Sequence, residues 1–176
     1  MRTWFQCSVK YAKENEQGML KTVSEKYLVD AVSFTEAEAR LYEVLGSVIR
    51  GDFQVTTVAK SNIVDVFYYE DTDVWYQCKI VYFVVDSNSG KEIKVTQFML
   101  VTADNVRDAY DRIFESLSNM LVTFRVPEIK ETAIMEIFPY EKEDEELLPA
   151  PGDNLIPVGK HKVWQDDENG EEDEDA

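Results

Sequence analysis

The sequence predicts an α+β domain built from two tandem β-β-α-β-β repeats that form one pseudo-twofold unit. Two observations carry this prediction. The segment WFQC at 4–7 returns as WYQC at 75–78, and a set of residues late in the first copy recurs 71 positions later. The recurring set is Phe53, Val55, Ile63, Phe67, Tyr69 and Glu70, which return as Phe124, Val126, Ile134, Phe138, Tyr140 and Glu141. Repeat one therefore spans about residues 3–70 and repeat two about 74–141.

The first repeat shows each of its elements in order. Residues 3–12 alternate between apolar and polar side chains, which is typical of a strand, and a second strand at 20–30 follows a polar turn. Ser33 and Glu36 have the spacing of a helix capping box, so a helix is expected from there to about residue 48. Strands at 53–60 and 62–69 complete the copy, with a short turn between them.

The second repeat predicts the same order. Strands are expected at 75–86 and 91–102, then a helix at 105–119 capped by Asp104, then strands at 121–130 and 132–140. Eight strands and two amphipathic helices predict antiparallel sheets with both helices packed on one face. The internal symmetry also leads us to expect that identical chains pair as a homodimer.

The composition changes after Tyr140. Residues 141–176 hold 14 acidic and 3 basic residues, whereas residues 1–140 hold 21 acidic and 15 basic ones. We expect 142–176 to be a linker and a disordered acidic C-terminal tail. Within it, an apolar and basic stretch is a candidate partner-binding segment through Ile156, Val158, Lys160 and Trp164.

The sequence contains few of the residues and motifs that enzymes use for catalysis. His161 in the tail is the only histidine, and the seven glycines are scattered through turns rather than gathered in a phosphate-binding loop. We therefore predict no enzymatic activity, no cofactor and no metal site. Cys7 and Cys78 occupy equivalent repeat positions. They are either two small buried strand residues or a bridge across the pseudo-twofold axis, which a reducing cytosol would oppose.

The chain shows no run of 18 apolar residues, and its first residues lack the apolar core of a signal peptide. No membrane association is expected, and a cytoplasmic location is the default prediction.

The candidate binding surface is the side of each first strand that faces away from the Phe5, Cys7 and Val9 side. Exposed tryptophans among lysines and glutamines would suit base stacking with phosphate contacts. The alternative is that both tryptophans fill a sheet-on-sheet or dimer core, and Val81 and Phe83 on the second copy's Trp side favour this packing. The candidate nucleic-acid-binding residues are Trp4, Gln6 and Lys10 in the first copy and Trp75, Gln77 and Lys79 in the second.

Two functions follow from this surface and from the tail. The first is single-stranded nucleic-acid binding, with the acidic tail recruiting a partner or competing for the binding groove. A body that is mildly negative and shows no basic stripe in the sequence weakens this prediction. The alternative is a protein-protein interaction adaptor, or an acidic decoy that binds a basic protein. Buried tryptophans would favour the adaptor, and exposed ones would favour nucleic acid.

Read from residue 53 onward, the element order β-β-β-β-α resembles the repeat order of the Whirly and Pur-type single-strand-binding proteins, which is an analogy of fold alone. A more specific resemblance rests on WFQC at 4–7, YLVDAVSFTEAEAR at 27–40 and ETAIMEIFPY at 131–140. With these segments, residues 1–141 resemble an uncharacterised domain family of Bacteroidetes bacteria and their phages. The resemblance implies a bacterial or phage cytosolic protein and transfers no site residue.

Overall fold

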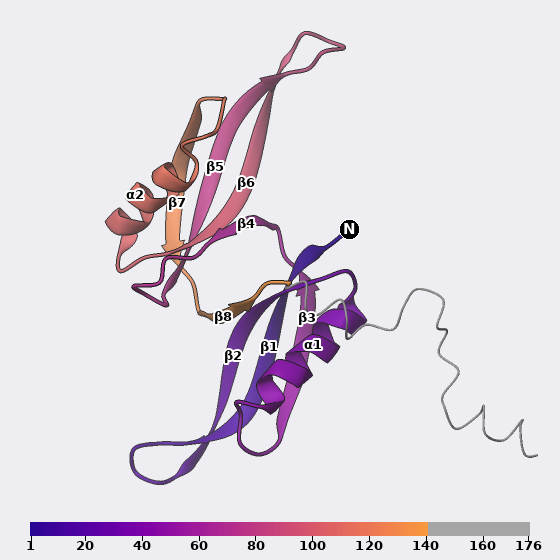
Figure 1. The fold of residues 1–176 in the computed structure, drawn as a ribbon, viewed down its shortest axis with the longest axis vertical. Helices are drawn as coiled ribbons and strands as arrows, with labels where there is room; N and C mark the ends of the chain where they lie inside the picture. Colours follow the sequence, from indigo (N-terminus) through magenta and orange to yellow (C-terminus); the bar gives the residue numbers. More distant parts are fainter. Residues whose placement is uncertain (141–176) are drawn as a thin grey trace, which may run out of the picture. The chain divides into compact units, whose positions relative to one another are not determined.

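The computed structural model describes residues 1–140, and the order β-β-α-β-β occurs twice in them (Figure 1). This arrangement confirms the predicted α+β class and is compatible with the duplication. The predicted tail and its segment with Ile156, Val158, Lys160 and Trp164 lie outside the described residues. The elements are β1 (Thr3–Glu14), β2 (Leu20–Ala31), α1 (Phe34–Gly46), β3 (Phe53–Lys60), β4 (Ile63–Phe67), β5 (Trp75–Val85), β6 (Glu92–Thr102), α2 (Val106–Ser116), β7 (Phe124–Glu131) and β8 (Ile134–Phe138).

The two halves exchange their last strands. One sheet has the order β3-β1-β2-β8 and the other has the order β4-β6-β5-β7. Thus β4, from the first half, lies at the edge of the second sheet, and β8, from the second half, lies at the edge of the first (Figure 1). Each sheet is therefore completed by a strand that is distant in sequence from its other three.

The exchanged strands pair in parallel, with Phe67 opposite Val101 and Phe138 opposite Val29. The prediction of wholly antiparallel sheets was wrong at these two edges. The physical reason lies in the short connections before β4 and β8, which do not turn back as hairpins. The Ser61 N–H donates to the Trp4 carbonyl (2.8 Å) and the Thr132 N–H donates to the Trp75 carbonyl (2.9 Å). The first bond holds the connection before β4 against the start of β1, and the second holds the connection before β8 against the start of β5. Beyond these points each chain segment continues to the other sheet.

Both helices begin with a side-chain cap. The Ser33 hydroxyl accepts from the Glu36 N–H (3.1 Å), and the Glu36 carboxylate accepts from the Val32 N–H (2.6 Å). The predicted start of α1 is thereby confirmed. In α2 the cap is Asn105, whose side chain accepts from the Asp108 N–H (2.9 Å). The prediction that Asp104 caps this helix was wrong by one residue, because the Asp104 N–H instead donates to the Asp108 carboxylate (3.1 Å).

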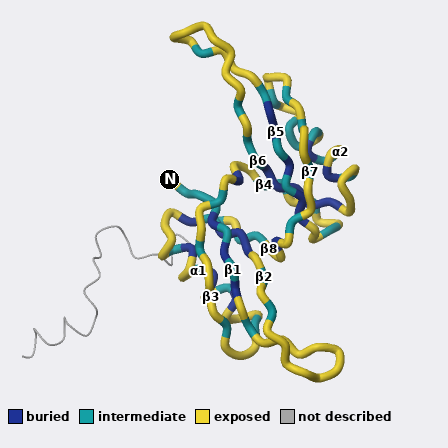
Figure 2. Tube along the Cα trace, turned by 180° about the vertical axis from the view of Figure 1, so that it is seen from behind, coloured by how far each residue is buried: buried dark blue, intermediate teal, exposed yellow. Residues whose placement is uncertain are grey.

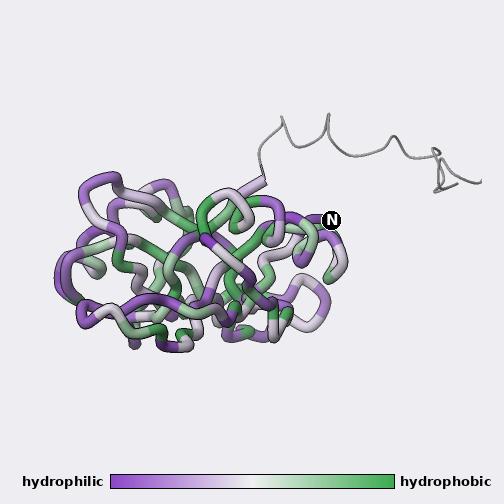
Figure 3. Tube along the Cα trace, turned by 90° about the horizontal axis from the view of Figure 1, so that it is seen from below, coloured by the Kyte–Doolittle hydropathy of each residue, from purple (hydrophilic) through white to green (hydrophobic). Residues whose placement is uncertain are grey.

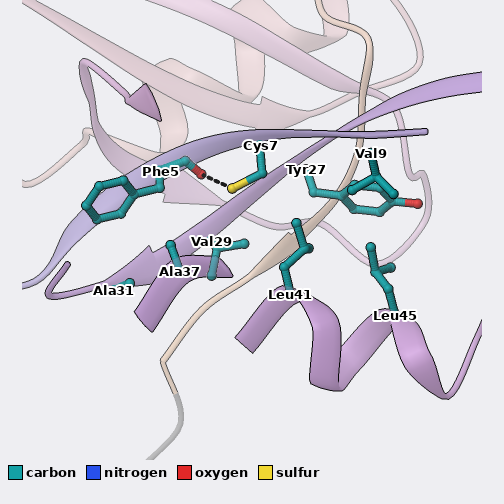
Figure 4. Close-up of a cluster of buried hydrophobic side chains, with 9 residues drawn as sticks. All are labelled: Phe5, Cys7, Val9, Tyr27, Val29, Ala31, Ala37, Leu41 and Leu45. Atoms are coloured by element: carbon teal, nitrogen blue, oxygen red, sulfur yellow. Dashed lines mark hydrogen bonds between the residues drawn. The ribbon is translucent and has the colours of Figure 1, made fainter. Parts of the chain in front are cut away.

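Each helix covers one face of its own sheet and buries a separate core. The core under α1 contains the alternate residues of β1 and β2 that face the helix, and Figure 4 shows them pointing toward Leu41 and Leu45. The core under α2 is built in the same way around Ile80, Val101 and Ile113. Cys7 belongs to the first core and Cys78 to the second, and both thiols are free and fully buried. The interpretation as buried strand residues is confirmed, and no bridge joins them.

A third core lies where the sheets' other faces meet. It unites Leu28 of the first sheet with Leu100 of the second, together with Trp75 and the first residues of the exchanged strands, Ile63 and Ile134. Four of these five residues come from positions that the repeat makes equivalent, namely Leu28 with Leu100 and Ile63 with Ile134. The third core therefore sits on the pseudo-twofold axis. Burial in Figure 2 follows this pattern, since the inner parts of the long strands are buried and the hairpin ends are exposed.

An arginine on each helix holds the segment that follows an exchanged strand. Arg112 of α2 donates to the Asp71 carboxylate (2.8 Å) and to the Thr102 carbonyl (3.0 Å), and it lies 4.8 Å from the centre of the Tyr69 ring. The equivalent Arg40 of α1 donates to the Pro139 carbonyl (3.0 Å). Both contacts join residues from different halves of the chain. They fix the ends of β4 and β8 against the helix of the opposite half.

Candidate binding surfaces

The structure divides the predicted site residues into two groups. Trp75 is 5% exposed and belongs to the third core, while Trp4 is half-buried and packs against that core. For Trp75 the structure therefore agrees with the packing alternative. Gln6, Lys10, Gln77 and Lys79 lie on the sheet faces opposite the helices; Lys10 is exposed and the other three are half-buried. Of these, Gln6 lies opposite Leu28 and Gln77 opposite Leu100, both residues of the third core.

We call these two surfaces the open faces: the sides of β1–β3 and of β5–β7 that face away from α1 and α2, from the edge of the third core to the hairpin ends. Residues directly opposite each other in a sheet share a face, so the register gives the composition of each surface. On the first open face Ser8 lies opposite Lys26, and Lys10 lies opposite Ser24 and Gln54.

The second open face is richer in charge and in aromatic side chains. Lys130 lies opposite Gln77, and Arg125 lies opposite Val81. Lys94 lies opposite Phe83, whose side chain is 44% exposed. Phe98 lies opposite Lys79, but it is half-buried and packs against the third core. The exposed Phe83 ring thus lies opposite one cationic residue, Lys94, and two positions along β5 from Val81, which lies opposite Arg125.

Charge is strongly segregated between these faces and the rest of the described chain. The open faces hold six basic residues against three acidic ones, Glu14, Glu92 and Glu128, although residues 1–140 contain 21 acidic and 15 basic ones. Glu14 and Glu92 lie at the hairpin ends, and Asp30 beside the third core forms an ion pair with Arg2 (3.5 Å). The six basic residues are Lys10, Lys26, Lys79, Lys94, Arg125 and Lys130.

Sequence reasoning identified Lys10 and Lys79 and missed the other four basic residues. The missed residues come from β2, β6 and β7, and no linear run of the sequence places them beside β1 or β5. Alternation along 91–102 could have placed Lys94, Thr96 and Phe98 on one side of their strand. The partner strands and their register were needed to show which face that was. Figure 3 shows polar and apolar stretches interspersed along the described chain.

A pocket of about 740 Å³ opens beside the third core. Both exchanged strands and the first residues of β1 and β5 contribute to its wall. Three pairs of lining residues are equivalent in the two repeats: Trp4 with Trp75, Val66 with Ile137, and Tyr68 with Pro139. The pocket therefore lies on the pseudo-twofold axis. Met135, Asp73 and Glu136 complete the wall, so the charged lining is acidic and the rest combines aromatic with aliphatic side chains.

The electrostatics around Tyr68 reflect this acidic wall. Its ring lies 5.9 Å from that of Trp75, and its hydroxyl is 3.5 Å from the Asp73 carboxylate. Partial desolvation, followed by the nearby carboxylates of Asp73, Glu70 and Glu136, raises the pKa of Tyr68 above its ordinary value of 10. A negative charge on this side chain is thus disfavoured by its surroundings.

The buried thiols are poor nucleophiles. Burial, with a smaller contribution from Glu38, raises the pKa of Cys7 to about 11, and burial raises the pKa of Cys78 to about 12. Both groups are therefore protonated near neutral pH. In the part of the chain that the structure describes, no three His, Cys, Asp or Glu side chains are grouped so that they could hold a metal ion. Within residues 1–140 no helix is long and apolar enough to cross a membrane.

The sequence of this domain matches one family model, which covers residues 3–140 and so includes both sheets, both helices and the pocket. The protein belongs to the family DUF4494. That family is described as a domain of unknown function, so membership assigns no activity to the open faces or to the pocket. No curated protein matches the chain. The DUF4494 match agrees with the uncharacterised family that the sequence resemblance implied.

Proposed function

We propose that this DUF4494 protein is a non-enzymatic binding protein that holds single-stranded nucleic acid across its open faces. The observation that carries this proposal is the segregation of charge. An acidic protein that gathers six basic side chains on two sheet faces creates local positive potential there, and elsewhere it repels a polyanion.

The side chains of the open faces suit the parts of a nucleic-acid strand. Lysine and arginine contact phosphates, and Phe83 offers an exposed ring on which one base can stack, for about 1–3 kcal/mol. Gln6 and Gln77 supply hydrogen bonds. Phe83 takes the stacking role that the sequence suggested for Trp75, because Trp75 is buried. Unstacked bases are available in a single strand and not in a duplex, which favours the single-stranded form.

Several expectations from the sequence belong to this proposal. The acidic residues of 141–176 would compete with nucleic acid for the open faces, or recruit a partner. The proposal also includes an origin in Bacteroidetes or their phages, a cytoplasmic location and pairing of identical chains. These follow from the family resemblance, from the lack of a long apolar run and from the internal repeat, respectively.

A second candidate function is an adaptor that binds a basic protein. Two observations favour it: the burial of Trp75, and the pocket on the pseudo-twofold axis with Asp73 and Glu136 in its wall. This site and the open faces are made of different residues and carry opposite charge. The two functions can therefore be tested separately.

The test of nucleic-acid binding is the anisotropy of fluorescent oligo-dT titrated with the full chain at several salt concentrations. If all six basic residues meet phosphates, the logarithm of the association constant falls with the logarithm of salt with a slope of about −4. The pair Lys94→Gln and Arg125→Gln should reduce the slope to about −3. A matched control is Lys21→Gln with Arg50→Gln, two exposed basic residues that lie outside the open faces.

Two results would contradict the proposal. The first is the absence of salt-sensitive binding by the full chain. The second is an equal loss of affinity in the Lys94 and Arg125 pair and in the control pair, since this would show that net charge alone, and not the open faces, attracts the strand.

A further inference from the structure

We propose that the pocket around Trp4 and Trp75 receives one arginine side chain of a basic protein partner. This inference develops the adaptor function and does not depend on nucleic-acid binding by the open faces. It assigns the pocket a ligand class, and it names Asp73 and Glu136 as the groups that recognise the charge.

The walls of the pocket match a flat cation. Tyr68, which is 57% exposed, and the half-buried Trp4 line the pocket with aromatic side chains, and Trp75 adds only its 5% exposed part. The faces of tryptophan and tyrosine attract a guanidinium within about 6 Å of the ring centre. Val66, Ile137 and Met135 cover the remaining surface with apolar groups that suit the methylene stem of a long side chain. The volume, about 740 Å³, lies in the range of binding pockets and exceeds what one water molecule fills.

Charge complementarity selects the sign of the occupant. Asp73 and Glu136 are both exposed at the pocket wall, and among the described residues that line it none is basic. Glu70 adds a third carboxylate close enough to act on Tyr68. An anionic ligand such as a phosphate would meet repulsion here, whereas a cation gains from two carboxylates at once.

The molecule itself already uses this arrangement elsewhere. Arg112 lies over the Tyr69 ring and reaches both oxygens of Asp71, directly beside the pocket residues Tyr68 and Asp73 in sequence. Arg2 lies 3.6 Å from the centre of the Tyr140 ring and donates to Glu36 (2.9 Å). In both places an arginine is held between a tyrosine face and a carboxylate. The pocket offers the same two components to a side chain from outside.

Arginine fits better than lysine for geometric reasons. A guanidinium is planar, so it stacks on an aromatic ring while its edge forms two parallel hydrogen bonds with a carboxylate. An ammonium is a strongly hydrated point charge that loses more on entering an apolar pocket. We therefore expect the pocket to prefer arginine to lysine, and both to a neutral side chain of the same shape.

Tryptophan fluorescence gives a direct readout. The chain has three tryptophans, two of which line the pocket, so the full chain with Trp164→Phe reports on Trp4 and Trp75 alone. The probe is the blocked peptide Gly-Ser-Arg-Ser-Gly, with twins in which citrulline or lysine replaces the arginine. Citrulline has nearly the shape of arginine without its charge.

We expect saturable binding of the arginine peptide, weakened about tenfold or more by citrulline, which corresponds to about 1.4 kcal/mol. Asp73→Asn and Glu136→Gln should each weaken it several-fold without altering oligo-dT binding. The control Glu115→Gln removes an exposed carboxylate of α2 that does not line the pocket and should bind like the parent.

Three outcomes would overturn the inference: no saturable change with the arginine peptide, equal affinity for the citrulline twin, or unchanged affinity in both pocket variants. Failure of oligo-dT binding in the same protein would contradict nucleic-acid binding alone. The two proposals are thus refuted by different measurements.

Discussion

The packing of the two exchanged strands in the third core can be tested through Ile63 and Ile134. These residues begin β4 and β8 at equivalent repeat positions, and they are 7% and 9% exposed within the third core. Both side chains lie in the third core, although they come from different halves of the chain. Ile63→Ala and Ile134→Ala therefore probe the packing of that shared core.

The expected magnitude follows from burial. Replacing a buried isoleucine by alanine removes apolar contacts and leaves a cavity, at a cost of about 2–5 kcal/mol. Each variant should lose about 3 kcal/mol of the free energy of unfolding, since both side chains are over nine-tenths buried. For a chain of this size the loss corresponds to a fall in melting temperature of about 3 °C per kcal/mol. Since the sites share a core, the double variant should depart from additivity by more than about 0.5 kcal/mol.

The assay is urea denaturation of the full chain, followed by circular dichroism, with the free energy extrapolated to water. The matched controls are Val64→Ala and Met135→Ala, which change the neighbouring residues of the same two strands at equivalent repeat positions. These side chains are 51% and 52% exposed, so each control should change the free energy of unfolding by less than about 0.5 kcal/mol.

Strict additivity would refute this reasoning. If Ile63→Ala and Ile134→Ala add within about 0.3 kcal/mol, the two side chains do not share a core. Losses in the exposed controls as large as those in the buried pair would equally contradict the assigned burial.

Three further predictions concern the tail, the thiols and an arginine. A chain that ends after Tyr140, once circular dichroism has shown that it folds, should bind oligo-dT more tightly than the full chain does. The difference should be largest at low salt, because residues 141–176 hold 14 acidic and 3 basic residues. Equal affinity of the two chains would exclude competition by the tail. The raised pKa values of Cys7 and Cys78, about 11 and 12 against 9.0, contribute stability that is fully present below pH 9 and is lost as pH rises through 11 to 12. A double Cys→Ser variant should therefore lose less stability between pH 9 and 11 than the parent does in chemical denaturation, and an equal loss would contradict the buried thiols. Arg112→Lys should speed amide hydrogen exchange in β4 and leave exchange in β3 unchanged. The reason is that lysine cannot form the two parallel hydrogen bonds that Arg112 forms with the Asp71 carboxylate. Unchanged exchange in both strands would show that Arg112 does not hold the exchanged strand.

Local patterns predicted the elements well because local interactions determine them. Alternation along residues 3–12 and 75–86 depends on each strand's own side chains, and the Ser33 cap depends on atoms three residues apart. The predicted start of α2 was one residue too early, because Asp104 and Asn105 can both cap a helix and the sequence does not distinguish them.

The candidate sites were less accessible to sequence reasoning. Lys10 and Lys79 were placed on the correct face, but their companions Lys26, Lys94 and Lys130 lie on other strands, and they come together through pairing register alone. The pocket could not be predicted, because β4 and β8 contribute to its wall and the turn before each strand does not indicate which sheet the strand will join.

The sequence by itself determined the duplication, the order of elements and the stripe of residues that each strand turns toward its helix, because periodicity along one segment decides which side chains share a face. The tertiary structure decided which strands become neighbours. Strand pairing joins segments that are far apart in the chain, and its free energy depends on contacts that no single segment contains. Only that pairing buried Trp75, gathered the basic residues on the open faces and placed Asp73 and Glu136 at one pocket.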